Sequence, residues 1–194
     1  MDEVDEVDEV REATVRPLRR DAAANRERVL AAAAQVFHEQ GLSAGLEEVA
    51  RRAEVGVGTV YRRFCSREAL LDALISDLLE VYLAEAERAG RQPGGAGLAT
   101  FVRTVAEVQA TPRGCVLRLW TSPAVERLRS QLHEQMACLL ADAQRHGTCR
   151  SDVMVEDLVG IFLALRGVRE TPTSAGGLDW RRHLELCLAG LQPR

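Results

Sequence analysis

The stretch from Val49 to Leu70 reads VARRAEVGVGTVYRRFCSREAL and decides the fold of the N-terminal part of the chain. A short amphipathic run over 46–53 ends at a turn, and a second short run begins near Gly56. The second run is rich in Arg, Thr and Tyr, and a third helix opens at Ser66. Two short helices joined by a tight turn are the layout of a helix-turn-helix, whose second helix enters the major groove of DNA. The alternative is an ordinary helical hairpin whose arginines form a solvated surface.

The second run, about 56–63, offers the side chains that read and hold DNA. Arg donates paired hydrogen bonds to a base edge, Thr offers a methyl and a hydroxyl group, and Tyr offers a hydroxyl to phosphate. We predict that Thr59 and one of the two neighbouring arginines reach base edges, while Tyr61 and Arg67 hold phosphates. The predicted DNA-contacting residues are Gly58, Thr59, Tyr61, Arg62, Arg63 and Arg67.

Residues at fixed offsets around this run match a known pattern. A helix ends in a Phe and a Gly, an apolar-Ala pair follows in the next helix, then a Gly-Thr-x-Tyr core, an aromatic residue and a Ser-Arg-Glu-Ala-Leu opening. These residues are Phe37, Gly41, Val49-Ala50, Gly58-Thr-Val-Tyr61, Phe64 and Ser66–Leu70. On these residues, the segment from about Asn25 to Leu74 resembles the DNA-binding domain of the TetR family of bacterial transcriptional repressors.

Three positions depart from that family's pattern. Glu54 stands in the turn where the family usually has Gly, so it must accept a strained backbone or the turn must adopt another geometry. Cys65 replaces a common Pro before the next helix. Gly45 replaces a Thr or Pro near the start of the second helix and is a weaker cap. None of these changes touches the Thr-x-Tyr-Arg-Arg surface.

Charge is unevenly distributed along the 194 residues, although the net charge is only −4. Residues 1–15 hold seven acids and one Arg, and residues 68–194 hold sixteen acids and fourteen Arg. Residues 16–67 hold ten Arg and six acids, a net charge of +4. The only basic segment therefore carries the predicted recognition helix, as electrostatic attraction to phosphate requires.

Several classes of protein are disfavoured by the sequence. No run of eighteen apolar residues is present to span a membrane, and the acidic N-terminus has no apolar signal-peptide region. Five widely spaced cysteines without a CxxC pair fit a reducing cytoplasm, where we expect the protein to lie. His146 and Cys149 have no second pair of ligands to complete a metal site, and no nucleophile elbow or HExxH motif occurs. We therefore predict no enzyme activity, no metal and no cofactor.

Helical periodicity continues through the chain, and no alternating strand pattern of useful length occurs. We predict an all-α fold of about nine helices, with a three-helix DNA-binding domain followed by a C-terminal helical domain. The predicted divisions are an acidic disordered tail over 1–15, a helix-turn-helix domain over 16–67 and an effector-binding and dimerisation domain over 68–194. Within the second division, we expect the first helix from about Asp21 to Glu39, and the recognition helix over about 56–63.

The resemblance implies that the last two long helices, roughly 155–169 and 178–192, pair with those of a second subunit. Both carry apolar residues on more than one face, which leaves apolar area for a partner or for the internal core. We favour a homodimer on an inverted-repeat operator of double-stranded DNA. The predicted dimer residues are Phe162, Leu165, Trp180, Leu184 and Leu188.

The resemblance also implies a small-molecule effector of unknown class, bound in the C-terminal domain. A pocket needs apolar walls and a few polar groups, but so does an ordinary core. The predicted pocket residues are Phe101, Cys115, Arg118, Trp120, His133, Met136 and Phe162. Taken together, the sequence predicts a homodimeric repressor released by a ligand. The alternatives are a regulator that activates or has no effector, and a helical module whose basic surface binds protein.

Overall fold

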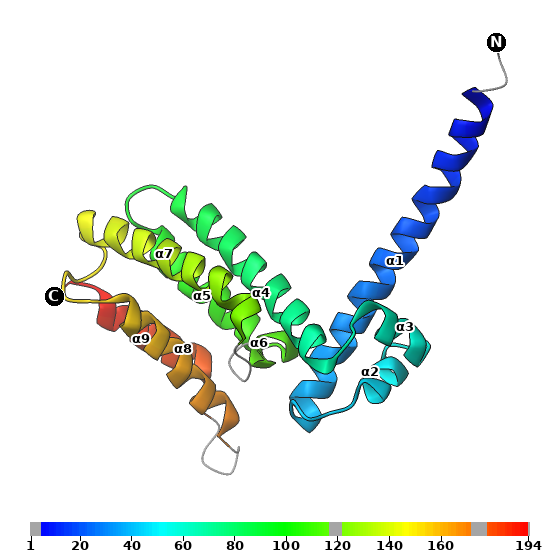
Figure 1. Ribbon diagram of the computed structural model, residues 1–194. Coiled ribbons are helices and arrows are strands. Elements are labelled where there is room, and N and C mark those ends of the chain that lie inside the picture. The colour runs from blue at the N-terminus through cyan, green and yellow to red at the C-terminus, as the bar shows by residue number, and fades with distance from the viewer. Residues whose placement is uncertain (1–4, 117–121, 172–177, 194) are drawn as a thin grey trace. The chain divides into compact units, whose positions relative to one another are not determined.

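Nine α-helices and no strands make up the described part of the chain in the computed structural model (Figure 1). The structure describes the backbone of residues 5–116, 122–171 and 178–193, and side chains from residue 23 onward except those of 115 and 116 within these ranges. The helices, and the absence of strands among the described residues, confirm the predicted all-α fold. The helices are α1 (Asp5–Gln40), α2 (Leu46–Arg52), α3 (Val57–Arg63), α4 (Arg67–Gly90), α5 (Gly97–Gln109), α6 (Pro112–Val116), α7 (Pro123–Arg145), α8 (Val155–Glu170) and α9 (Trp180–Leu191).

The chain forms two compact units, one over Met1–Leu74 and one over Ile75–Arg194. Helix α4 contributes its first residues to the first unit and the remainder to the second. In the described residues, no helix combines the length and the apolar character needed to cross a membrane.

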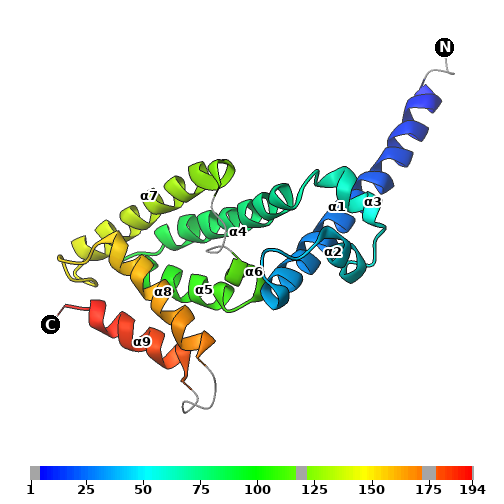
Figure 2. The same cartoon turned by 60° about the horizontal axis from the view of Figure 1, so that its bottom comes forward.

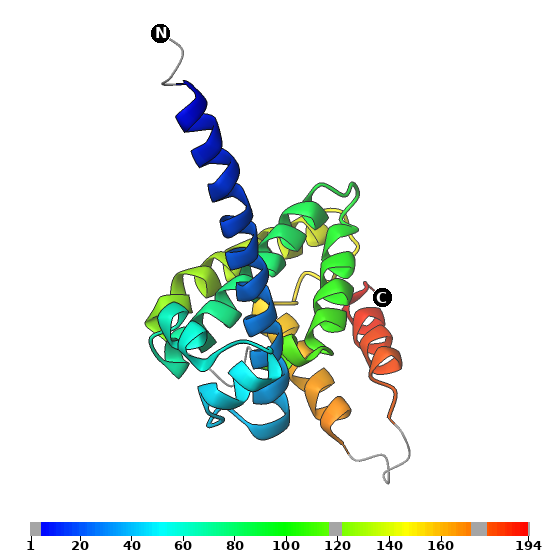
Figure 3. The same ribbon diagram turned by 90° about the vertical axis from the view of Figure 1, so that its right-hand side faces the viewer.

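In the first unit, α2 packs against α1, and α3 packs against α2 (Figure 3). The apolar stripe of α1 recurs at helical spacing, with Val29, Ala33, Val36 and Phe37 all buried. Helix α1 ends at Gln40, and the next residue, Gly41, has a φ of 84° that favours glycine and donates its N–H to the Phe37 carbonyl at 3.1 Å. The unit therefore has a core of its own beneath the two short helices.

Helix α1 is longer than the sequence predicted, because it begins at Asp5 rather than near Asp21. Residues 5–15, which we expected to be a disordered tail, have helical backbone in the structure. Glu, which favours helix, occurs three times in this segment, which also contains no Gly or Pro to end the helix. The domain limits at 15 and 67 stay a prediction.

In the second unit, α5 contacts α6, α7, α8 and α9, and Figure 2 shows it beside α6 and α8. Its buried face includes Phe101, Val102 and Val105, with exposed fractions of 2% or less. Gly97 begins α5 at a very close approach of the chain, because a Cβ there would lie 2.3 Å from the Ala89 carbonyl oxygen. Glycine at this position lets α5 follow α4 through a tight connection.

Two reciprocal ion pairs join α5 to α9. Arg103 on α5 donates two hydrogen bonds to Glu185 on α9, at 2.8 and 2.9 Å. Arg181 on α9 donates two to Glu107 on α5, both at 2.8 Å. The pairing of 103 with 185 and of 107 with 181 makes the two helices antiparallel. Planar guanidinium and carboxylate groups paired in this way fix register as well as contributing energy.

Candidate DNA-binding face

The turn between α2 and α3 contains a strained residue, so of the two alternatives for Glu54, a strained backbone or another turn geometry, the structure has the first. Glu54 has a φ of 55°, in the left-handed region where non-glycine residues are disfavoured. The N–H groups of Ala53 and Val55 donate to Val49 and Ala50 carbonyls at 2.9 and 3.1 Å, which closes the end of α2. The left-handed residue turns the chain sharply into α3, so the helix-turn-helix geometry is kept without the usual glycine.

Helix α3 has one buried face and one exposed face. Val60 is fully buried, and Phe64, just after the helix, is 6% exposed, so these residues anchor α3 to the unit. On the other face Tyr61 is 46% exposed, and both Gly58 and Arg62 are exposed as well. All six predicted DNA-contacting residues therefore lie in α3 or at the first residue of α4, with Thr59 and Arg67 partly buried and Arg63 exposed.

The arginines of α2 are neutralised within the protein. Arg52 donates to Glu39 on α1 at 3.1 and 2.8 Å, and this bond is the largest cause that lowers the pKa of Glu39. Arg51 donates to Glu48 at 2.8 Å, which likewise lowers the pKa of Glu48. The Arg52–Glu39 pair attaches α2 to α1, the Arg51–Glu48 pair lies within α2, and together they leave little free charge on α2.

The arginines of α3 differ in this respect. Arg62 and Arg63 form no ion pair with any residue that the structure describes. Among the described residues, the Arg62 guanidinium donates only to the Thr59 hydroxyl, at 3.3 Å. Arg67 pairs with Glu68 at 2.9 Å. Two positive charges without an ion-pair partner among the described residues therefore lie next to each other on the exposed part of α3, an arrangement that attracts polyanions.

One polar contact on this face was not predicted from the sequence. The Tyr61 hydroxyl donates to Glu47 of α2, at 2.9 Å. The two residues are fourteen apart in the sequence, and this spacing carries no periodic signal. The contact arises because α2 and α3 pack together.

The described residues predicted to form an effector pocket are mostly buried in the second unit. Phe101 on α5, Met136 on α7 and Phe162 on α8 are 1%, 5% and 6% exposed. His133 is exposed instead, and lies 3.7 Å from the Glu156 carboxylate. Arg118 and Trp120 lie outside the described residues, as does the side chain of Cys115. The apolar members of the predicted set thus sit on three helices of one core.

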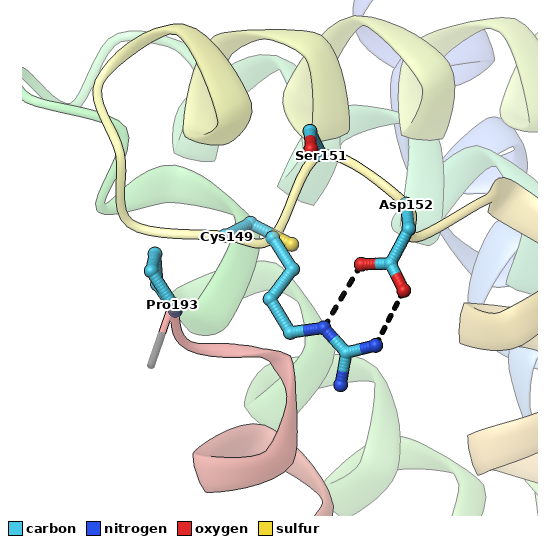
Figure 4. Close-up of a pocket in the computed structure, with 5 residues that line it drawn as sticks. Cys149, Ser151, Asp152 and Pro193 are labelled. Atoms are coloured by element: carbon cyan, nitrogen blue, oxygen red, sulfur yellow. Dashed lines mark hydrogen bonds and ion pairs between the residues drawn. The ribbon is translucent and has the colours of Figure 1, made fainter.

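A surface hollow of about 580 Å³ lies elsewhere in the second unit (Figure 4). Cys149, Arg150, Ser151 and Asp152 line it from the α7–α8 loop, with Pro193 from the segment after α9. The Arg150 guanidinium donates to Asp152 at 2.9 Å, so the charges in the hollow neutralise each other. Burial raises the pKa of the Cys149 thiol, which disfavours the reactive thiolate. None of these five residues belongs to the predicted pocket.

The residues predicted at a dimer interface mostly lie inside one protomer. Phe162, Leu165, Leu184 and Leu188 are 6% exposed or less, because α8 and α9 bury them against α5 and each other. Trp180 is partly exposed and stacks with the guanidinium groups of Arg169 and Arg181. The exposed large apolar residues of these two helices are Val159, Leu163 and Leu186, at 42%, 52% and 59%.

A helix-turn-helix with two unpaired arginines on its exposed helix, joined to a separate helical unit, defines a DNA-binding regulator. The family of "Bacterial regulatory proteins, tetR family" matches residues 29–74. The family "Transcriptional regulator SbtR-like, C-terminal domain" matches residues 92–193. The chain belongs to the TetR family of transcriptional regulators.

Solved structures agree with this assignment. A TetR transcription regulatory protein from Mycobacterium vanbaalenii is 30% identical, with 91% of this chain and 100% of that chain covered and a TM-score of 0.64. The regulator SCO0520 from Streptomyces coelicolor is 28% identical, covering 87% and 98%, with a TM-score of 0.62. PfmR from Thermus thermophilus shares the fold at 20% identity, covering 87% and 98%, with a TM-score of 0.65. No curated protein matches the chain significantly.

Proposed function

We propose that the protein is a homodimeric repressor that binds an inverted-repeat operator and is released by a small-molecule effector. The observation that carries the proposal is the pair of uncompensated charges on α3, Arg62 and Arg63, beside a helix α2 whose arginines are internally paired. On a surface that meets only water, we expect no such difference in ion pairing between two neighbouring helices. A surface that attracts phosphate needs free cations at the contacting helix.

Gly58 provides a second argument that the exposed face of α3 contacts DNA. A Cβ built on Gly58 meets nothing within 4 Å, and its φ is not positive, so neither packing nor backbone conformation within the protein requires glycine there. Glycine does allow the backbone of α3 to approach an outside partner closely. In the proposed complex, Thr59 and one of the two arginines reach base edges, and Tyr61 and Arg67 hold phosphates on either side.

The proposed dimer uses the outer faces of α8 and α9. The exposed Val159, Leu163 and Leu186 are accompanied by small residues, Gly160 and Ala189, that are also exposed. Contiguous exposed apolar residues mark interaction surfaces, and small residues let two helices approach closely. Phe162, Leu165, Leu184 and Leu188, which we expected at this interface, instead form the core that holds α8 and α9 together beneath the proposed surface.

An effector is supported by structural neighbours rather than by a cavity in this chain. One neighbour, 20% identical, is a SmeT–triclosan complex, and another, 19% identical, is a gamma-butyrolactone receptor. We infer that a ligand enters the unit that holds Phe101, Met136 and Phe162. Helix α4 is continuous from Arg67 to Gly90 and belongs to both units, so we propose it as the element that carries the signal. The ligand must bind the released conformation better than the DNA-bound one.

The test is a binding assay with DNA from upstream of the protein's own gene, at several salt concentrations. We expect the Arg62→Ala and Arg63→Ala double variant to lose operator affinity and to reduce the salt dependence of binding. Arg51→Ala is the matched control, since it removes an arginine that Glu48 already neutralises. Equal losses in the two variants, or salt-independent binding by the wild type, would refute the proposed face.

A further inference from the structure

Glu47 connects the two helices of the helix-turn-helix on its exposed side. It is the second residue of α2, and its Oε1 atom accepts a hydrogen bond from the Tyr61 hydroxyl of α3 at 2.9 Å. Both residues are exposed, so the contact lies at the surface that we propose for DNA rather than in the core. The Arg52–Glu39 ion pair attaches α2 to α1, whereas the Tyr61 contact joins α2 to α3.

Gly45 leaves the space that the Glu47 carboxylate occupies. A Cβ on Gly45 would lie 2.8 Å from Oε2 of Glu47, so the flexible Glu47 side chain would have to move away from this position. The backbone of Gly45 is ordinary extended chain, with φ −78° and ψ 155°, so conformation does not require glycine there. The carboxylate also accepts a hydrogen bond from its own backbone N–H, and this bond is the largest cause that lowers the pKa of Glu47. The absence of a capping side chain at Gly45 thus lets Glu47 fold back towards α3.

The arrangement is incompatible with a phosphate contact by the same hydroxyl. A tyrosine hydroxyl has one proton, and a carboxylate and a phosphate oxygen both only accept hydrogen bonds at neutral pH. While Tyr61 donates to Glu47, it has no proton for the DNA backbone. The negative carboxylate also repels a phosphate that approaches Tyr61.

We propose that Glu47 restrains Tyr61 and thereby weakens sequence-independent binding of the recognition face to the DNA backbone. This inference rests on the proposed role of Tyr61 as a phosphate contact. Arg62 and Arg63 attract any DNA, whatever its sequence, and Glu47 opposes that attraction at the neighbouring position. Glu47 is a positioning residue, since it acts through the Tyr61 hydroxyl.

The experiment measures binding of the full chain to a labelled random-sequence DNA duplex over a range of salt concentrations. Glu47→Gln keeps a hydrogen bond, because its amide donates to the Tyr61 oxygen and leaves the hydroxyl proton for phosphate. We expect Glu47→Gln to bind about fivefold more tightly, the size of one exposed charge contact. Glu54→Gln is the matched control, because it removes the same charge from the same helix-turn-helix without touching Tyr61.

A double-mutant cycle separates this role from general charge. In a chain that carries Tyr61→Phe, we expect Glu47→Gln to have a clearly smaller effect, since the hydroxyl that Glu47 restrains is gone. Glu47→Asp keeps the charge but is too short to reach Tyr61, so its affinity for the random-sequence duplex should lie between those of the wild type and Glu47→Gln. Glu47→Asp also replaces Glu47→Gln in the test if the latter fails to fold. The same gain in both backgrounds, a gain no larger than that of Glu54→Gln, or weaker binding by a folded Glu47→Gln would overturn the inference. Wild-type protein without salt-dependent DNA binding would refute the proposed function instead.

Discussion

Replacement of Glu54 by glycine should stabilise the protein, although it removes a side chain. Glu54 holds a φ of 55°, and a left-handed conformation costs a residue with a Cβ about 1–2 kcal/mol. Glycine has no such strain, but it loses about 0.5–1 kcal/mol more than other residues through backbone entropy on folding. The difference predicts a net gain of about 0.5–1 kcal/mol in the free energy of unfolding for Glu54→Gly.

The assay is urea unfolding followed by circular dichroism, with the slope of the transition checked for constancy. Glu54→Ala is the matched control, because it removes the same side chain and keeps the strain, so it should bring no gain. Gly41→Ala supplies the converse, since its φ of 84° makes a Cβ unfavourable and the variant should lose stability. Glu54→Gly that is no more stable than Glu54→Ala would show that the Glu54 side chain, not its backbone, governs the turn.

Three further predictions concern assembly, packing and pH. Leu163→Glu should convert a dimer to a helical monomer in sedimentation, whereas Val81→Glu, also at an exposed position, should not; a wild-type monomer would refute the dimer. Arg103→Glu or Glu185→Arg alone should lower the thermal midpoint, and the two together should restore part of it; additive losses would argue against the ion pair. The pKa of Glu39 is lowered in the folded chain, so its carboxylate contributes to stability above the ordinary pKa of 4.5 and this stability is lost as pH falls through the folded pKa. Glu39→Gln should therefore flatten the acidic part of a profile of unfolding free energy against pH. An unchanged profile would contradict this prediction.

The helix-turn-helix was predictable because its signals are local. A short amphipathic run, a turn and a second run that anchors through Val60 all lie within about twenty residues, so their order along the chain dictates their contacts. The buried stripe of α1 was predictable for the same reason, since Val29, Ala33 and Val36 recur at helical spacing. The start of α1 was not, because helix boundaries depend on weak preferences summed over many residues.

The pocket and the dimer surface could not be predicted from periodicity, because periodicity does not say which apolar face of a helix is buried. Helix α8 is apolar on two sides, and either side satisfies a helical pattern. The structure buries Phe162 and Leu165 and exposes Val159 and Leu163. His133 was predicted as a polar group of the pocket, yet it lies exposed beside Glu156. Which face of a helix meets its neighbours is decided only by the packing of all helices in the unit.

The sequence alone determined the all-helical fold, the position of the recognition helix and the residues that α3 presents, because these follow from spacing within one or two turns of chain. It also identified Glu54 as the unusual residue of the turn. Only the tertiary structure decided that Glu54 takes a left-handed backbone, that the arginines of α2 are paired while those of α3 are not, and that Glu47 meets Tyr61. The Arg52–Glu39 and Tyr61–Glu47 contacts join residues of different helices, and their energies exist only when packing brings the helices together.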